Sequence, residues 1–316
     1  MAEFIQQAQN DAAAVRAELL AGLAAERARV SPKYLYDALG SCLFEAICAL
    51  PEYYPTRTEA AIFERRADEI GACCGAGATL IDLGAGNCAK AARLFPVLRP
   101  SHYVALDISA DFLQEALARL QQRFPAIAMA GVGIDFSHSL ELPETVPAAR
   151  RLFFYPGSSI GNFAPPQALE FLRRVRRAAG DDGGLLIGVD LLKPAALLEA
   201  AYDDALGVTG AFNLNLLRHL NELLDADFDV RDWRHRAHFD AAESRIEMHL
   251  EARADLTVCW PGGQRRFAEG ERIHTENSYK YTPAGFAELL RQAGFGALRS
   301  WTDERDWFMV CHARAV

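Results

Sequence analysis

The stretch that most constrains the fold is residues 79–90, Thr-Leu-Ile-Asp-Leu-Gly-Ala-Gly-Asn-Cys-Ala-Lys. A short apolar run ends at Asp82, the pair Gly84 and Gly86 follows, and a helix-forming segment begins directly afterwards. This order is typical of a buried strand, a tight turn and a helix, in which glycines let the backbone approach a ligand and the helix N-terminus offers free N–H groups. Such turns serve nicotinamide, flavin and S-adenosylmethionine (SAM) cofactors alike. The motif therefore predicts a nucleotide-binding crossover without choosing the cofactor.

Strand-like and helix-like segments alternate downstream of this motif. The expected strands cover residues 79–83, 103–107, 128–135, 151–155 and 184–190, and the expected helices cover residues 88–95, 109–123 and 165–180. Repeated strand–helix units predict a parallel sheet that is covered on both faces and binds ligands at the carboxyl ends of its strands.

The alternation of strand-like and helix-like segments ends after residue 194. Residues 195–225 read as helices, residues 228–240, 245–252 and 254–260 as antiparallel strands, and residues 282–290 as a capped helix. The last strands, near 297–301 and 307–312, are expected to complete the first sheet as an antiparallel edge. The Ala- and Leu-rich residues 3–29 predict a helix. We therefore expect an α/β fold, in which a Rossmann-like sheet, of the kind shared by nicotinamide-, flavin- and SAM-dependent proteins, is interrupted by a second, α+β lobe that the N-terminal segment completes. The expected boundaries are 58–194 and 281–316 for the domain with the glycine turn, and 1–57 and 195–280 for the second domain.

Composition narrows the possible partners. A net charge of −9 and a pI near 5.4 argue against nucleic acid, because phosphate binding needs a concentrated basic face. No apolar run approaches the roughly 20 residues of a membrane span, and the first residues lack the pattern of a signal peptide. The seven cysteines form no C-x-x-C pair, which indicates reduced thiols rather than disulfides or a zinc site. We expect a soluble cytoplasmic protein.

Acidic residues at three strand ends favour SAM as the cofactor. Asp82 precedes the glycine turn, Asp107 closes the second strand, where a carboxylate can take both ribose hydroxyls, and Asp135 and Phe136 close the third, where they can meet the adenine. The alternative is that Asp107 and Asp135 only cap the helices that follow. Lys90 opposes the dipole of its helix, which indicates that it reaches the ligand's carboxylate, although a solvated surface lysine fits the same pattern.

Four further segments carry a more specific signal. They are Pro-Lys-Tyr-Leu-Tyr-Asp-Ala-Leu-Gly-Ser-Cys-Leu-Phe at 32–44, Leu-Pro-Glu-Tyr-Tyr-Pro-Thr-Arg at 50–57, Tyr-Pro-Gly-Ser-Ser-Ile-Gly-Asn-Phe at 155–163 and Ile-His-Thr-Glu-Asn-Ser-Tyr-Lys-Tyr at 273–281. In this order they closely resemble the L-histidine Nα-methyltransferase family, which catalyses the first step of ergothioneine biosynthesis, over about residues 30–315. The resemblance implies trimethylation of the α-amine of L-histidine to hercynine by a two-lobed monomer, with SAM as cofactor and S-adenosylhomocysteine (SAH) as product.

The resemblance also implies roles for individual residues. Asn162 would fix the α-carboxylate and amine of the substrate, and Tyr202 would grip the carboxylate. Tyr53, with Tyr54 as the alternative, would line the same pocket. Tyr36 would approach the amine that is methylated. No metal site is implied.

Glu276 and Ser278 would bind the imidazole. A carboxylate opposite an imidazole supplies a charge-assisted hydrogen bond, about twice as strong as a neutral one, and relatives that act on tryptophan have no imidazole to pair. Taken without the resemblance, Glu276 reads as an exposed strand carboxylate, Asn162 as a turn residue, and Tyr53 and Tyr202 as ordinary half-buried tyrosines.

The remaining polar residues favour structural roles. His235 and His238 lie three apart in a strand-like segment and should face opposite sides, which disfavours a metal pair. His249 and His274 read as structural histidines, and Cys88 lacks a partnered base. Two other functions stay open: an Nα-methyltransferase for another amino acid such as tryptophan, or a SAM-binding lobe that has lost catalysis and serves as a partner protein.

Overall fold

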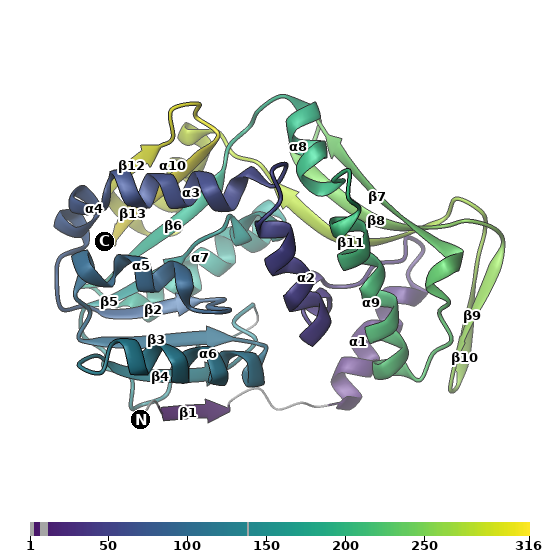
Figure 1. Ribbon diagram of the computed structural model, residues 1–316, viewed down its shortest axis with the longest axis horizontal. Coiled ribbons are helices and arrows are strands. Elements are labelled where there is room, and N and C mark those ends of the chain that lie inside the picture. Colours follow the sequence, from purple (N-terminus) through teal and green to yellow (C-terminus); the bar gives the residue numbers. More distant parts are fainter. Residues whose placement is uncertain (1–2, 7–11, 138) are drawn as a thin grey trace. The chain divides into compact units, whose positions relative to one another are not determined.

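The computed structural model describes residues 3–6, 12–137 and 139–316, and the chain divides into two compact units (Figure 1). Unit 1 comprises Met1–Ala8, Pro55–Leu192 and Lys280–Val316, and unit 2 comprises Gln9–Tyr54 and Lys193–Tyr279. The chain crosses between units at 54/55, 192/193 and 279/280, where the sequence predicts 57/58, 194/195 and 280/281.

Unit 1 is built on an eight-stranded sheet in the order β1-β4-β3-β2-β5-β6-β13-β12. Its strands are β1 (Glu3–Gln6), β2 (Thr79–Leu83), β3 (His102–Asp107), β4 (Ala128–Gly133), β5 (Arg151–Tyr155), β6 (Gly184–Asp190), β12 (Phe295–Thr302) and β13 (Phe308–Ala315). Its helices are α3 (Tyr54–Arg65), α4 (Ala67–Cys74), α5 (Ala89–Leu98), α6 (Ala110–Arg123), α7 (Pro165–Ala179) and α10 (Pro283–Gln292), with a 3-10 turn, η2, at Ser159–Asn162. The expected α/β class is confirmed.

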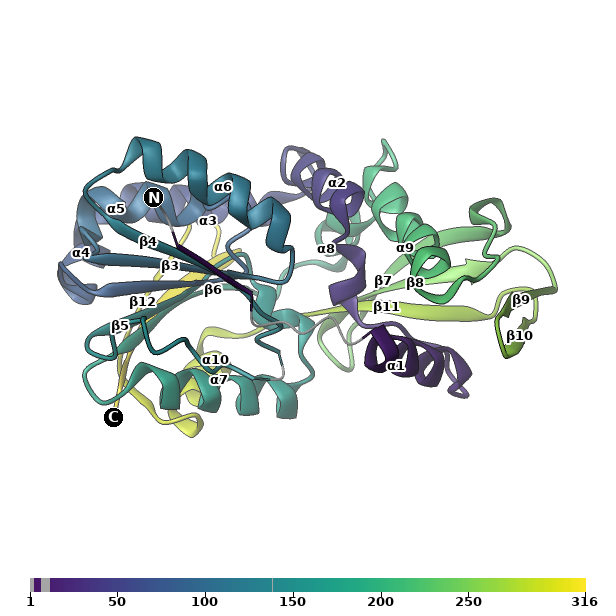
Figure 2. The same cartoon turned by 90° about the horizontal axis from the view of Figure 1, so that it is seen from below.

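Both faces of this sheet are buried, which explains the continuous apolar strands. Alternate residues of β2 point to opposite sides, so Leu80 joins one hydrophobic core and Ile81 the other. Figure 2 shows α3 to α6 over one face and α7 with α10 over the other. The strands from β1 to β6 run parallel, and β13 and β12 close the sheet antiparallel, as the sequence predicts.

The predicted helix over residues 3–29 is wrong at its start. Residues 3–6 form β1, which pairs in parallel with β4 at the edge of the sheet and belongs to unit 1 rather than to unit 2. The glycines of β4 make this possible, because a Cβ at Gly131 would lie 2.8 Å from the Phe4 ring. Pairing and packing thus override helix propensity, and the helix itself, α1, covers Ala12–Ala24.

Unit 2 combines helices with two small antiparallel sheets. Its helical elements are α1, η1 (Pro32–Leu35), α2 (Ala38–Cys48), α8 (Ala195–Tyr202), α9 (Val208–Leu224) and η3 (Val230–Asp232). Its strands are β7 (Trp233–Asp240), β8 (Arg245–Ala252), β9 (Leu256–Trp260), β10 (Gly263–Phe267) and β11 (Arg272–Tyr279). The order of the larger sheet is β11-β8-β7, and β9 and β10 form a hairpin of their own. The part predicted as a strand from residue 228 begins with the 3-10 turn η3.

The central strand β8 explains which residues unit 2 buries. Ile246, Met248 and Leu250 are buried on one face of the sheet, and α9 contributes the buried Phe212 and Leu216. The opposite face carries Glu247, His249 and further polar residues. Within the described part of the chain, no helix is long and apolar enough to cross a membrane.

Candidate active site

The glycine turn of unit 1 has the backbone conformation that its residues predict. Gly84 and Gly86 both have positive φ, at 70° and 51°, which is a region that side chains with a Cβ disfavour. A Cβ added at Gly86 would meet no atom within 4 Å, so the turn borders open space there. Helix α5 begins three residues later, at Ala89. The turn therefore leaves room for a ligand beside the helix N-terminus.

Asp107 ties the turn to the end of β3. Its Oδ2 accepts from the Gly86 N–H at 2.9 Å, and its Oδ1 accepts from the Ser109 N–H at 2.9 Å. Burial raises the pKa of Asp107 despite these backbone hydrogen bonds, which favour the charged form. The carboxylate thus connects the glycine turn to the loop after β3. Its bond to Gly86 shows that it does more than cap the helix that follows.

Asp135 and Phe136 lie just past β4, which ends two residues earlier than the sequence predicts. Asp135 Oδ1 accepts hydrogen bonds from the backbone N–H and the hydroxyl of Ser137. A Cβ at Gly84 would lie 3.7 Å from the Phe136 ring, so the structure brings this ring beside the glycine turn. The ring also packs edge-on against Tyr155, with centroids 6.0 Å apart.

Asp82, near the end of β2, is a buried carboxyl with a tyrosine hydroxyl as its partner. Its side chain is buried, with 2% of the residue exposed, and Oδ2 accepts from the Tyr103 hydroxyl at 2.7 Å. Burial is the largest cause that raises the pKa of this carboxyl to about 7, while the Tyr103 hydrogen bond and Lys90 lower it. Asp82 therefore supports the end of β2 from inside the core.

Lys90 has a partner that the sequence did not suggest. Its Nζ lies 2.9 Å from Oε2 of Glu59, whose side chain is 1% exposed, whereas that of Lys90 is 36% exposed. The other Glu59 oxygen, Oε1, accepts from the Gly157 N–H at 2.7 Å. Glu59 stands in an ordinary helix-forming segment, so nothing in its sequence context signals this role.

Asn162 ends the short turn η2, which follows β5. The residue is half-buried. The preceding loop is fixed at Ser158, whose Oγ accepts from the Asp190 N–H at the end of β6 at 2.8 Å. The Asn162 loop is thereby attached to the same edge of the sheet as the glycine turn, because β5 lies next to β2.

In unit 2, Tyr202 and Ser278 form a buried pair. Their hydroxyl oxygens lie 2.7 Å apart, and the residues are 7% and 3% exposed. The Tyr53 ring meets that of Tyr202 edge-on, with centroids 6.1 Å apart. Burial, followed by the proximity of Tyr202 and other acidic groups that include Glu276, raises the pKa of Tyr53 well above its usual value. The structure thus brings four of the predicted residues together.

An irregularity in β11 decides which way Glu276 points. The strand pairs His274 with His249 but Glu276 with Met248, so Thr275 is an extra residue, a β-bulge. Because residues that pair across strands share a face, the bulge moves Glu276 and Ser278 to the apolar face of β8, while His274 stays on the polar face. The bulge has no recognisable signal in the sequence.

The other two predicted tyrosines have different surroundings. The half-buried Tyr36 ring lies edge-on to Phe44 and Phe212, with centroids 5.5 Å away in both cases. Tyr54 is 1% exposed, and the ammonium of Lys193 lies 4.5 Å from its ring centroid. Tyr53 is therefore the residue of the pair that contacts the Tyr202 ring.

The polar face of unit 2 gathers a second set of titratable groups. His238, Glu247 and His249 place one ligand-type atom each within 4.8 Å of one another, and Glu247 Oε2 lies 2.9 Å from His249 Nε2. Burial lowers the pKa of His249 to about 4. A metal-bound histidine normally donates its second ring N–H to an acceptor, yet Nδ1 of His249 is buried and meets no partner among the described residues. We therefore interpret the cluster as hydrogen-bonded side chains, in which Glu247 also forms an ion pair with Arg245. His235 bonds Asn213 and the Tyr202 carbonyl instead, on the opposite face.

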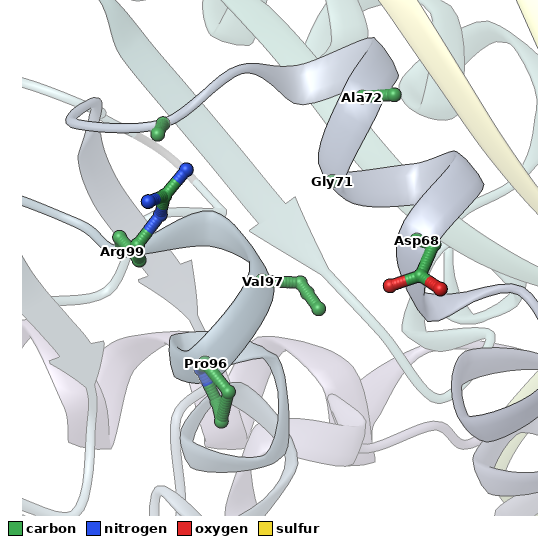
Figure 3. Close-up of a pocket in the computed structure, with 7 residues that line it drawn as sticks. Asp68, Gly71, Ala72, Pro96, Val97 and Arg99 are labelled. Atoms are coloured by element: carbon green, nitrogen blue, oxygen red, sulfur yellow. The ribbon is translucent and has the colours of Figure 1, made fainter.

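A pocket of about 370 Å³ lies between α4 and the end of α5 (Figure 3). It is lined by Asp68, Gly71, Ala72, Ala76, Pro96, Val97 and Arg99. None of the predicted site residues contributes to it.

Comparison with known protein families shows which family this chain belongs to. Residues 15–315 match the family described as "Histidine-specific methyltransferase, SAM-dependent". The chain belongs to this family. Histidine N-alpha-methyltransferase of Mycolicibacterium smegmatis is 40% identical over 303 residues, which cover 94% of this chain and 93% of the relative. The enzyme of the same name from Mycobacterium tuberculosis is 38% identical over 305 residues, covering 92% of each chain. Ergothioneine biosynthesis protein 1 of Neurospora crassa is 31% identical over 277 residues, which cover 85% of this chain and 31% of that one.

Membership makes the chain a SAM-dependent methyltransferase, and the polar groups of unit 1 fit that cofactor. The open space at Gly86 can admit a ligand that a larger residue would obstruct. Both Asp107 oxygens keep lone pairs beyond their backbone bonds, so the carboxylate can also accept from ribose hydroxyls. The Phe136 ring can pack against an adenine face, and the partly exposed Lys90 ammonium can donate to a carboxylate.

Proposed function

We propose that this protein transfers methyl groups from SAM to the α-amine of L-histidine, three times in succession, to give hercynine for ergothioneine biosynthesis. The observation that carries the proposal is the β-bulge in β11, which directs Glu276 and Ser278 to the face where Tyr202 meets Ser278. A buried carboxyl beside hydroxyl groups is the side-chain reader that an imidazole requires. Family membership and the two mycobacterial relatives support the same substrate.

We assign the cofactor roles as follows. Asp107 accepts from the ribose hydroxyls, and Asp135 with Phe136 holds the adenine. Lys90 binds the α-carboxylate of SAM. Gly84 and Gly86 allow close approach, and Asp82 supports the turn from below.

The substrate roles follow the chemistry of a free amino acid. Asn162 holds the α-carboxylate and the amine, Tyr202 binds the carboxylate, and Tyr36 approaches the amine. Tyr53 lines the pocket in preference to Tyr54, because its ring contacts Tyr202.

Glu276 and Ser278 bind the imidazole. The 1–3 kcal/mol cost of leaving such a buried polar group unpaired disfavours phenylalanine or leucine.

Bound SAM supplies an activated methyl group on a sulfonium. The chain's own task is to hold a neutral amine in line with that methyl, and orientation carries much of the rate. The raised pKa of Tyr53 keeps its phenol protonated, so this residue orients and donates rather than acting as a base. We propose that the amine proton leaves to a water held by Asn162 and a tyrosine.

The decisive test is mass spectrometry of L-histidine incubated with SAM and the protein. We expect products with one, two and three added methyl groups. A panel of amino acids that includes tryptophan tests the substrate, and methyl transfer to tryptophan in preference to histidine would overturn the assignment. Absence of transfer from isotopically labelled SAM to any amino acid would indicate a SAM-binding partner protein instead.

Two variants test the roles within this function. Asn162→Ala should lose turnover of histidine while it still binds SAM, and normal turnover would contradict the role of Asn162. Glu276→Ala should weaken histidine binding selectively and relax discrimination against tryptophan. An unchanged ranking of substrates would remove Glu276 from the imidazole site.

We further propose that the protein works as a cytoplasmic monomer without nucleic-acid or membrane partners. The seven cysteines, all within the described residues, form no disulfide, which suits a reducing compartment, and the net charge of −9 disfavours phosphate backbones. Light scattering at the concentration of the activity assay tests the oligomeric state.

A further inference from the structure

Glu59 is a buried carboxyl to which no motif assigns a role. It lies in α3, and both of its oxygens are used: Oε2 by the Lys90 ammonium at 2.9 Å and Oε1 by the Gly157 N–H at 2.7 Å. One side chain therefore connects three separate parts of unit 1, which are α3, the first turn of α5 and the loop after β5.

The surrounding backbone leaves space for this connection. A Cβ at Gly188 on β6 would lie 2.1 Å from Glu59 Oε1, and a Cβ at Gly157 would lie 2.8 Å from Lys90 Nζ. A Cβ at Gly188 would also lie 2.9 Å from the Phe308 ring, and the φ of Gly157, 78°, favours glycine, so a side chain at either position would disturb the pair.

Stability alone is a weak reason for such a pair. A buried carboxylate has a large desolvation cost, and apolar residues of similar volume often stabilise a fold as well as a buried ion pair does. The location suggests a different reason. Lys90 and Gly157 follow β2 and β5, which are neighbours in the sheet, and α/β folds bind their ligands where the connections from two neighbouring strands run in opposite directions.

We propose that Glu59 is a positioning residue for the amino-acid end of SAM. It holds the Lys90 ammonium in place for the SAM α-carboxylate, and through Gly157 it fixes the loop that continues to Asn162. This inference rests on the proposed function, because Lys90 and Asn162 receive their roles there. Glu59 itself is buried and has no contact with the ligand.

Two substitutions separate its two contacts. In Glu59→Gln, the amide oxygen can still accept from the Gly157 N–H, whereas the amide NH₂ cannot accept from Lys90. Glu59→Ala loses both contacts. Glu64→Gln is the matched control, because Glu64 is an exposed residue of the same helix.

Two ligands separate positioning from general damage. SAH carries the amino-acid end, whereas 5′-methylthioadenosine has the same adenosine and thioether without it. We expect Glu59→Gln to bind SAH about tenfold more weakly by calorimetry, the scale of one charge-assisted hydrogen bond, and to bind methylthioadenosine like the wild type. Lys90→Met should show the same discrimination, and adding Glu59→Gln to it should cause no further loss of SAH affinity.

The second contact is tested by kinetics. Glu59→Gln should raise KM for SAM and leave KM for histidine near the wild-type value, whereas Glu59→Ala should raise both. Equal loss of SAH and methylthioadenosine binding in Glu59→Gln, or unchanged SAH binding, would overturn the inference. A wild-type protein that fails to methylate histidine would contradict the proposed function. The binding comparison for Glu59 could still be interpreted, because SAH binding requires no methyl transfer.

Discussion

The glycine-turn region of unit 1 and the Tyr202 region of unit 2 are each stabilised internally, by different kinds of hydrogen bond. In unit 1, carboxylates bond to backbone N–H groups: Asp107 to Gly86, Asp135 to Ser137 and Glu59 to Gly157. In unit 2, side chains meet side chains from remote segments, as when Tyr202 meets Ser278 across 76 positions of sequence.

This difference determines what each region tolerates. A carboxylate that bonds to backbone N–H groups fixes the conformation of the whole loop, whichever side chains that loop has. A hydroxyl pair depends on two particular side chains and on the bulge that orients one of them. We therefore expect substitutions in unit 1 to affect a whole binding surface, and substitutions in unit 2 to affect one contact each.

The strongest test of this contrast is Asp107→Ala. The change removes the proposed acceptor for the ribose hydroxyls and also the hydrogen bonds to Gly86 and Ser109. Two charge-assisted hydrogen bonds at about 2 kcal/mol each predict a loss of SAH affinity of about 1,000-fold by calorimetry. Asp68→Ala, at an exposed carboxylate of α4, is the control. A loss below about tenfold would place Asp107 outside the cofactor site.

Asp82 should make the stability of unit 1 depend on pH. Its folded pKa, about 7, lies above the ordinary 3.8, so the folded state retains a proton that the unfolded state releases. The contribution of this proton to the free energy of unfolding is largest below pH 4, at most about 4 kcal/mol. It falls as pH rises to about 7 and is absent at higher pH. Asp82→Asn removes it, since both states then lack the titrating proton.

The measurement for Asp82 is denaturant unfolding without SAM at pH 5 and pH 8. The stability difference between variant and wild type should shift in favour of the variant at pH 8. Other buried groups, such as His312, are present in both proteins and cancel in this difference. A difference that does not change with pH would show that Asp82 ionises normally.

His249 in unit 2 should have the opposite sign. Burial lowers its pKa from 6.5 to about 4, so between these pH values the unfolded state binds a proton and the folded state does not. The resulting contribution to stability is full above pH 6.5 and is lost as pH falls toward 4, with an upper size of about 3 kcal/mol. In unfolding measurements between pH 4 and 7, His249→Gln should therefore show a flatter pH dependence than the wild type. An equal slope in both proteins would contradict this assignment.

Sequence patterns predict the parts of the fold that local rules determine. The elements β2, α5, β3 and α7 lie close to the expected ranges, because strand–helix alternation and capping act over short distances. Residues 3–6 differ, since pairing with the glycine-bearing β4 outweighs helix propensity, and a pairing partner more than 120 positions away leaves no local trace.

The same distinction applies to the candidate site. The positions of the two glycines follow from the turn motif, and that of Asp107 follows from its place at the end of a predicted strand. Glu59 could not be predicted, because its partners, Lys90 in α5 and Gly157 in the loop after β5, lie 31 and 98 positions away in the sequence. The bulge at Thr275 could not be predicted either, because strict alternation would have placed Glu276 on the same face as His274.

Ser278→Ala gives the smallest effect and tests unit 2 most directly. The change removes the hydroxyl that meets Tyr202 at 2.7 Å and leaves a buried phenol with one partner fewer. We expect kcat/KM for histidine to fall about tenfold, equivalent to about 1.4 kcal/mol, while SAH affinity stays at the wild-type value. Tyr202→Phe removes the same bond from the other side, and because the two residues share one contact, the double variant should lose less than the product of the single losses. Ser300→Ala, at an exposed strand position, is the control for the loss of a serine hydroxyl. Independent losses in the double variant would mean that the two hydroxyls act separately, and the single-contact description of unit 2 would then be wrong.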